Sequence, residues 1–337
     1  MTSFVMLHHS PTRARAPLPA ALEPVSLPDI QAAQARIDGT AVRTPLVRLR
    51  EDSAAETWLK LETLQPINSF KIRGALSAMR ALPPERLTAG VYTASAGNMA
   101  QGLAWAAREI GVPCRVIAPD HAPQTKIDAI VRLGASVRRV PFAEWWQVML
   151  DHGAAGERGT FIHPGADPAV IAGNATIGLE IIEQLPDVEA ILVPYGSGGL
   201  ACGIACAARA IKPSVKVYAV EVETAAPFTA SLAAGHPVQV DYTSTFVDGM
   251  GGKGVLEEMW PLARTVLAGS LVVTVRQVAD ALRLIAERTR VIAEGAGAAS
   301  VAAARAHVSA GGRVACVVSG GNIDFGKLTT ILGGGIP

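Results

Sequence analysis

One lysine, Lys71, lies in the segment NSFKIRGA (residues 68–75), where residue types and spacing fit chemistry at an amine. It follows Phe70 and precedes the small residues Gly74 and Ala75, with Arg73 as a second cation. A lysine near its ordinary pKa of about 10.4 is mostly protonated, so it acts as a nucleophile or base only where its surroundings favour the neutral amine. A solvated surface lysine is the common alternative, and the rest of the sequence decides between the two.

A glycine-rich loop in LVPYGSGGLACGIACAARA joins a buried strand to an alanine-rich helix. Backbone N–H groups at the start of such a helix, together with the helix dipole, favour a phosphate. Gly196, Gly198 and Ala201 also fit the dinucleotide pattern G-x-G-x-x-A, and Glu221 ends the next strand. An NAD-binding or non-catalytic α/β protein that uses only the Gly196–Gly199 loop therefore remains a second hypothesis at this point.

Two further loops favour a different cofactor. The segment TASAGNMAQG provides backbone donors between a strand and a helix, and CVVSGGNID ends a buried strand with polar residues. Each loop alone is typical of a helix cap or turn. A reactive lysine, a phosphate loop, a carboxylate loop and a partner for a ring nitrogen are together what pyridoxal phosphate requires.

These motifs, in colinear order from about Pro28 to the C-terminus, carry a family resemblance. SFKIRGA, SAGN-x-AQG, the glycine loop, EGAGAA and SGGN resemble the serine/threonine dehydratase branch of the fold-type II (tryptophan synthase β-like) pyridoxal-phosphate enzymes. The resemblance implies a carbon–oxygen lyase of amino-acid catabolism, a dehydratase (ammonia-lyase). It would eliminate water from an L-3-hydroxy amino acid of the threonine/serine type, or a bulkier one such as phenylserine, to give the 2-oxo acid and ammonia. Such proteins are expected to be cytoplasmic homodimers.

The same resemblance implies a role for each motif residue. Lys71 would hold the cofactor as a Schiff base and later act as the α-proton base, Asn98 would bind the ring hydroxyl, and Ser319 would face the ring nitrogen. Glu294 would lie near the ring and support the residues that contact it, although a buried carboxylate at a helix start is nearly as good an interpretation. The remaining cofactor contacts would come from Phe70, Gly196, Ser197, Gly198, Gly199 and Leu200, and the substrate carboxylate would bind Ser95, Ala96, Gly97, Asn98 and Met99.

Three residues depart from the family pattern near the site. Met99 stands where histidine is common, so it either lines an apolar substrate pocket or fills the core. Ala96 stands where serine racemases carry an acid/base serine, and because alanine cannot move a proton, racemisation is not expected. Ser197 interrupts an all-glycine loop and is predicted to donate to the phosphate.

A metal site is not predicted. Glu221 matches the first carboxylate of the cation site found in serine racemases, but Pro227 stands where the second is expected. Glu223 is read as a surface carboxylate. The scattered cysteines lack the spacing of a zinc site and are read as buried small side chains.

The elements that must position these residues follow an α/β pattern. Strands are expected at 90–95, 114–119, 135–140, 190–196, 215–221 and 313–320, and helices at 98–110, 123–134 and 143–153. The apolar runs fit central parallel strands, and the alternation implies right-handed βαβ units. With the resemblance, this predicts two open, mostly parallel sheet domains, the smaller inserted in the larger. Residues 26–88 and 168–337 would form the large cofactor-binding domain, 89–167 the small one, and 1–25 a disordered arm.

Composition narrows the classes of partner. The chain has 337 residues, 50% hydrophobic, with 30 basic and 29 acidic side chains spread along it. No basic stripe is interleaved with aromatic residues, so nucleic acid is not an expected partner. The apolar run near the N-terminus is too short for a signal or membrane segment, so we predict a small-molecule enzyme without a membrane partner.

Overall fold

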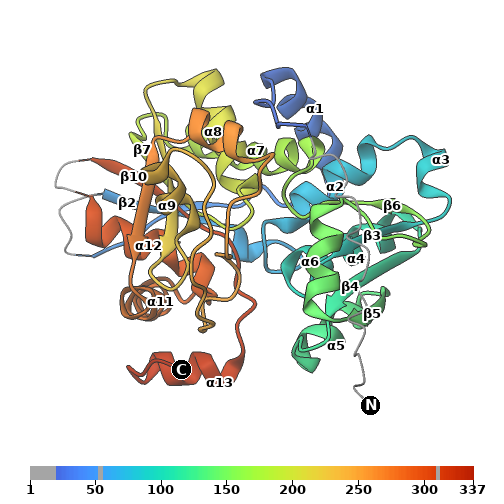
Figure 1. Ribbon diagram of the computed structural model, residues 1–337. Helices are drawn as coiled ribbons and strands as arrows, with labels where there is room; N and C mark the ends of the chain where they lie inside the picture. Colours follow the sequence, from blue (N-terminus) through green and yellow to red (C-terminus); the bar gives the residue numbers. More distant parts are fainter. Residues whose placement is uncertain (1–19, 52–55, 309–311) are drawn as a thin grey trace, which may run out of the picture.

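Two β-sheets organise the protein. The computed structural model describes residues 20–51, 56–308 and 312–337 (Figure 1). Within them the strands form a six-stranded sheet, in the order β1-β2-β10-β7-β8-β9, and a four-stranded sheet, in the order β5-β4-β3-β6. All neighbouring strands run parallel except β1, which pairs antiparallel with β2 in the register Val47 to Leu59. The prediction of a mostly parallel α/β fold is confirmed.

The six-stranded sheet uses both ends of the chain. Its strands are β1 (Leu46–Arg48), β2 (Glu56–Leu61), β7 (Ala190–Pro194), β8 (Lys216–Val222), β9 (Gly269–Val273) and β10 (Arg313–Val318). Its surrounding helices are α1 (Leu27–Ile37), η1 (Glu62–Leu64), α7 (Pro168–Gln184), α8 (Gly199–Ile211), α9 (Pro227–Ala234), α10 (Trp260–Val266), α11 (Val275–Thr289), α12 (Gly295–His307) and α13 (Phe325–Leu332).

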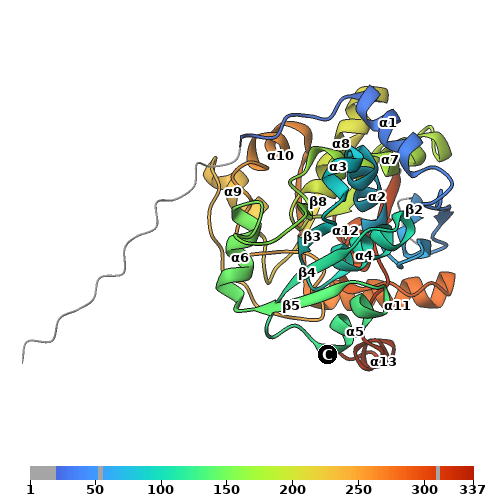
Figure 2. The same cartoon turned by 90° about the vertical axis from the view of Figure 1, so that its right-hand side faces the viewer.

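The four-stranded sheet lies between β2 and β7 in chain order, as the predicted insertion requires. It contains β3 (Val91–Ala94), β4 (Cys114–Pro119), β5 (Ser136–Val140) and β6 (Thr160–Phe161). The helices of this part of the chain are α2 (Lys71–Ala81), α3 (Pro84–Leu87), α4 (Asn98–Ile110), α5 (Gln124–Arg132) and α6 (Phe142–Leu150). Figure 2 shows this sheet with α4 and α5 beside it.

The central strands β7 and β10 of the large sheet are buried on both faces, which explains their continuous apolar sequences. Ile191 and Val193 of β7 pack with α7 and α8, whereas Leu192 packs on the opposite side with α11 and α12. Alternate residues of a strand point to opposite faces, so a strand covered by helices on both sides must be apolar throughout.

Helix α2 connects the two sheets. Its buried residues Ile72 and Leu76 belong to the same hydrophobic cluster as Val91 of β3 and Val116 of β4. The sequence analysis assigned α2 to the large domain, and the helix contacts both parts of the chain, since Gly74 lies against Val170 of α7. The boundaries at residues 88/89 and 167/168 remain a prediction.

The N-terminal arm can be followed only from residue 20, since residues 1–19 lie outside the described residues. The last part of the predicted arm contacts the core: the Leu22 backbone N–H donates to the Glu258 carbonyl at 2.9 Å, and Val25 packs on the cluster of α7 and α8. In the described part of the chain, no helix has the length and apolar character needed to cross a bilayer.

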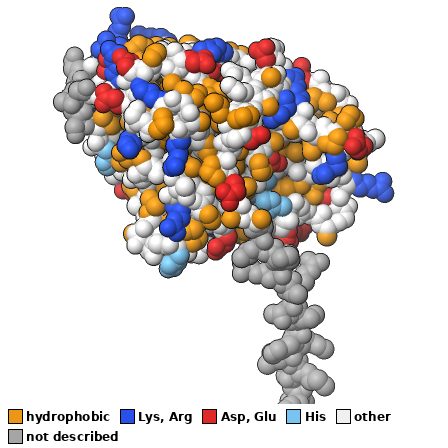
Figure 3. Space-filling model, turned by 90° about the horizontal axis from the view of Figure 1, so that it is seen from above, with side chains coloured by type: hydrophobic (Ala, Val, Ile, Leu, Met, Phe, Trp, Pro, Cys, Tyr) orange, Lys and Arg blue, Asp and Glu red, His pale blue; other side chains and the backbone are white. Residues whose placement is uncertain are grey.

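Surface and cysteine properties agree with the sequence analysis. On the face drawn in Figure 3, basic and acidic side chains are interspersed with apolar ones and no basic stripe is seen. The cysteines are free thiols and all are buried, as their reading as small apolar side chains predicted: Cys114, Cys202, Cys206 and Cys316.

Candidate active site

Lys71 is the first residue of α2, and its partly buried side chain lies between the two sheets. The Nζ donates to the Pro164 carbonyl at 2.6 Å and lies 5.1 Å from the centre of the Phe70 ring. Burial lowers the pKa of Lys71 to about 8. A lysine with this pKa has a substantial neutral fraction near neutral pH, which a nucleophilic amine requires.

Backbone contacts bring Lys71 next to the loop that follows β10. Asn68 has a left-handed backbone (φ 55°), which turns the chain into α2. The Phe70 N–H donates to the Ser319 carbonyl at 3.0 Å, and Ser69 pairs with Gly320 as an isolated bridge. The predicted residues Phe70, Lys71 and Ser319 therefore lie together although they are distant in sequence.

A buried ionic cluster holds the first turn of α2 in place. The Arg73 guanidinium bonds Glu62 (Nε to Oε2, 2.8 Å) and Glu180 (NH1 to Oε1, 2.7 Å). Lys60 also bonds Glu180, at 2.5 Å between Nζ and Oε2. Burial opposes ionisation of Glu62, but Arg73 outweighs it and lowers the pKa of this carboxyl. Removing one partner from such a cluster would leave a buried charge uncompensated.

The loop after β3 fits a carboxylate. Helix α4 begins at Asn98 with Gly97 as its N-cap, and within the described part of the chain no side chain caps it. A Cβ placed on Gly97 would meet nothing within 4 Å, so the helix start faces open space. Unpaired N–H groups and the positive end of the dipole then remain available to an anion.

The Met99 side chain turns away from this opening. It is 2% exposed and belongs to the cluster with Leu103 and Ile72. This placement favours the packing role over the pocket-lining role, both of which the sequence left open. The Met99 backbone remains in the first turn of α4, beside the carboxylate loop.

Asn98 connects the two sheets through a chain of polar side chains. Its Nδ2 donates to Glu294 Oε1 at 2.8 Å, and its Oδ1 accepts from Asn322 Nδ2 at 2.8 Å. Burial raises the pKa of Glu294 to about 7, and repulsion from Asp248 adds to the rise. The second Nδ2 hydrogen of Asn98 takes part in neither of these bonds, so it can donate to a ligand hydroxyl.

The glycine loop after β7 leads into the start of a second helix, α8. Gly198, the N-cap of α8, has φ 91°, a conformation that favours glycine. No described side chain caps α8. The Leu200 side chain packs into the cluster of α7 and α8, so only its backbone could contact a phosphate.

Ser197 packs against a residue that the sequence analysis did not select, Gly165. A Cβ on Gly165 would lie 2.0 Å from Ser197 Oγ and 2.6 Å from Ser197 Cβ. The side chain of Ser197 therefore occupies the space that any larger residue at position 165 would need. The segment HPGADP (residues 163–168) is rich in turn-forming residues, so a loop could be predicted there. Its contact with Ser197 could not be predicted from residue types.

The helices α2, α4, α8 and α12 all begin around one site, at Lys71, Asn98, Gly199 and the N-cap Glu294. The contacts of Lys71 with Pro164, of Asn98 with Glu294 and of Gly165 with Ser197 connect these helix starts. The dipoles of the four helices make the site favourable for a doubly anionic ligand. A partly buried amine with a lowered pKa, the glycine-loop helix start that no described side chain caps, Asn98 as partner for a ring hydroxyl and the neutral hydroxyl of Ser319 fit pyridoxal phosphate. The site thus defines the class: an α/β enzyme that uses a lysine-bound aldehyde cofactor.

Comparison with known proteins identifies the family. Residues 37–320 match the family described as pyridoxal-phosphate dependent enzyme, and the chain belongs to it. Pyridoxal phosphate is accordingly its cofactor, and the NAD hypothesis is not favoured.

Two curated relatives with the same name are similar to most of the chain. The L-threonine ammonia-lyase of Thermotoga maritima is 39% identical over 322 residues, covering 93% of this chain and 79% of that protein. The L-threonine ammonia-lyase of Geobacter sulfurreducens is 40% identical over 315 residues, covering 91% and 78%.

Two solved structures have a similar fold over most of the chain. The processed form of threonine deaminase isoform 2 from Solanum lycopersicum has a TM-score of 0.82 at 31% identity, covering 95% of this chain and 98% of that one. Maize serine racemase also has a TM-score of 0.82, at 30% identity, covering 91% and 96%. The fold-type II class predicted from the motifs is confirmed.

The carboxylate that matches the first cation ligand of serine racemases has a structural role here. Glu221 is fully buried and accepts from the Phe228 and Thr229 N–H groups at 2.8 and 2.7 Å, and from Ser270 Oγ at 3.0 Å. It thereby satisfies the first turn of α9. Glu223 accepts from the Val275 N–H at 2.9 Å, at the start of α11.

Proposed function

We propose that this enzyme is a dehydratase of L-threonine and L-serine, releasing the 2-oxo acid and ammonia. The observation that carries the proposal is the Lys71 amine with its lowered pKa, near the starts of α4 and α8, which no described side chain caps. The relatives named L-threonine ammonia-lyase support the same reaction. Their name places the reaction among the carbon–nitrogen lyases, which corrects the carbon–oxygen class given in the sequence analysis.

The net reaction balances without an oxidant. The α-hydrogen leaves as a proton, the Cβ–O bond breaks, and water is lost. The resulting enamine tautomerises and is hydrolysed, so that one water enters and ammonia leaves. Bound pyridoxal phosphate supplies the electron sink that acidifies the α-hydrogen.

The site residues predicted from the sequence each have a proposed role in this reaction. Lys71 takes the α-proton, for which burial gives it a suitable pKa of about 8. The first turn of α4, from Ser95 to Met99, orients the substrate carboxylate. The loop Gly196–Leu200 holds the phosphate, and Asn98 holds the ring hydroxyl, with Glu294 behind it.

Ser319 is the proposed partner of the ring nitrogen. A neutral hydroxyl does not enforce a protonated ring, unlike a carboxylate, so the electron sink is weaker. Rapid loss of a β-substituent is then favoured over a long-lived carbanion, which is consistent with elimination. Ala96 provides no second proton carrier, which disfavours racemisation.

Substrate size is the finer question. The packing of Met99 against Leu103 removes the main reason to expect an enlarged apolar pocket. We therefore propose threonine and serine ahead of bulkier substrates such as phenylserine. The family resemblance is also the basis for proposing a cytoplasmic homodimer; sedimentation of the purified protein would test the dimer.

The test is a substrate panel with the cofactor-loaded enzyme. L-Threonine, L-serine, 3-hydroxyaspartate and L-threo-phenylserine are compared by following the 2-oxo acid and ammonia separately. The proposal expects equal amounts of both products and the highest kcat/KM with threonine or serine. If neither threonine nor serine gives a 2-oxo acid while the cofactor is bound, the proposed function is contradicted. A higher kcat/KM with phenylserine would instead support the pocket-lining role of Met99.

A further inference from the structure

His163 lies in the loop between β6 and α7 and organises its own backbone. Its Nδ1 accepts the N–H groups of Gly165 at 3.0 Å and Ala166 at 2.7 Å. Burial lowers the pKa of His163 to about 3, so the ring is neutral at physiological pH. Since Nδ1 accepts two hydrogen bonds, the single proton of the neutral ring lies on Nε2.

The turn that His163 holds contacts both proposed attachment points of the cofactor. The Pro164 carbonyl accepts from Lys71 Nζ at 2.6 Å. The next residue, Gly165, packs against the glycine loop: a Cβ on Gly199 would lie 2.6 Å from the Gly165 carbonyl oxygen. A shift of residues 163–166 would therefore displace the amine and the phosphate loop together.

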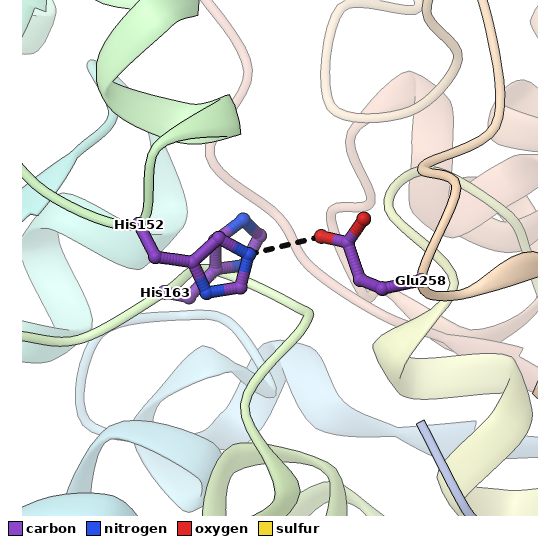
Figure 4. A group of neighbouring side chains, drawn as sticks. All are labelled: His152, His163 and Glu258. Carbon is purple, nitrogen blue, oxygen red and sulfur yellow. Dashed lines mark hydrogen bonds and ion pairs between the residues drawn. The ribbon is translucent and has the colours of Figure 1, made fainter. Parts of the chain in front are cut away.

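A metal ion is the obvious alternative use of His163. His152, His163 and Glu258 each offer a ligand atom, all within 4.8 Å of one another (Figure 4). A metal-bound histidine normally donates from its other ring nitrogen. Here Nδ1 accepts instead, so Nε2 would have to lose its proton to bind a metal. His152 already pairs with Glu258 at 3.0 Å and stacks on His163 with ring centres 4.6 Å apart.

We propose that His163 is a positioning residue, whose Nδ1 holds the 163–166 turn so that the Lys71 amine and the glycine loop keep the separation that the cofactor requires. The inference rests on the proposed roles of Lys71 and Gly196–Gly199 and deepens them. His163 does not touch the reacting atoms; it acts through the Pro164 carbonyl and the Gly165 backbone.

The test compares His163→Asn with His163→Gln. Asparagine places Oδ1 where Nδ1 lies and can accept the same N–H groups, as in an Asx turn. Glutamine places its acceptor one bond further, near Nε2. The exposed His121→Gln is the matched control. The readouts are the apparent Kd of pyridoxal phosphate for the apoenzyme and the pKa of Lys71, obtained from the pH dependence of covalent cofactor attachment.

The Asn variant is expected to stay within about three-fold of wild type in Kd, whereas loss of two backbone hydrogen bonds in the Gln variant should weaken binding by roughly ten-fold or more. The Lys71 pKa should stay near its wild-type value in the Asn variant, and in the Gln variant rise toward the ordinary value of about 10.4 as the Pro164 carbonyl shifts and water enters. Equal behaviour of the two variants would overturn the proposal. The proposal would also be overturned if Zn²⁺ changed the Kd of pyridoxal phosphate for the wild-type enzyme but not for either variant.

A measurement without a variant covers the case in which both fail to fold. The ¹⁵N shifts of histidine-labelled wild type should show His163 unprotonated at Nδ1 and protonated at Nε2 from about pH 5 to 9. A proton on Nδ1 would contradict the proposal. These readouts need no turnover, so absence of dehydratase activity in wild type would overturn the proposed function alone.

Discussion

Replacing Gly165 by alanine is expected to weaken cofactor binding in the wild-type chain and to have little further effect in a chain that already carries Ser197→Gly. The new methyl group would lie 2.0 Å from Ser197 Oγ and 2.6 Å from Ser197 Cβ. The hydroxyl can rotate away, but the Cβ cannot, so the glycine loop or the 163–166 turn must move. Overpacking of this kind costs about 1–3 kcal/mol, a loss of roughly 5- to 150-fold in affinity if the loop bears it.

The double variant separates steric overlap from other effects. In Gly165→Ala/Ser197→Gly both close atoms are gone, and the next contact of the methyl group is the residue 197 carbonyl at 3.6 Å, an ordinary van der Waals distance. Ser197→Gly alone should lose a charge-assisted hydrogen bond to phosphate, about 1.5 kcal/mol or roughly ten-fold in Kd. The double variant should bind about as Ser197→Gly does.

Titration of the four apoenzymes with pyridoxal phosphate, followed by absorbance, gives the coupling free energy, and thermal unfolding shows whether stability changes in parallel. We expect a favourable coupling of at least about 1 kcal/mol between the two substitutions. Additive losses, with no coupling, would refute the close approach of Gly165 to Ser197.

Three further predictions concern the buried groups around the site. Arg73→Met should lower the free energy of unfolding by about 3–5 kcal/mol in urea titrations, because Glu62 and Glu180 lose their shared partner; a change below about 1 kcal/mol would show that the cluster does not need it. Glu294 has its pKa raised from 4.5 to about 7, so its favourable contribution to folding is complete below about pH 4.5 and falls by about 3 kcal/mol as pH rises through 7. Apoenzyme Glu294→Gln should lack this pH dependence, and identical profiles would contradict the raised pKa. Ser319→Asp should slow elimination while cofactor affinity stays largely intact, and an unchanged rate would show that Ser319 does not face the ring nitrogen.

Much of the fold was predictable because its signals are local. The apolar runs that became β7, β8 and β10 need no knowledge of their neighbours, and the α4 start at Asn98 follows from the SAGN loop. The signal that Met99 packs in the core was also present, since it lies four residues before Leu103 on the apolar side of α4.

The contacts that complete the site were not predictable, since they depend on tertiary structure. The carbonyl that accepts from Lys71 belongs to Pro164, and a backbone oxygen has no residue-type signature. The ion cluster of Arg73 joins residues more than 100 positions apart, such as Glu180. The edge strand β1 is only three residues long, too short for a periodic pattern to show.

The central claim is that Lys71 is the lysine that holds the cofactor. Borohydride reduction of the pyridoxal-phosphate-loaded enzyme, followed by proteolysis and mass spectrometry, tests it directly. The pyridoxyl group should be found on the peptide containing Lys71, and Lys71→Ala should retain no covalent label and lose several powers of ten in turnover. A label on another lysine, such as Lys60 or Lys126, with Lys71 unmodified, would contradict the account.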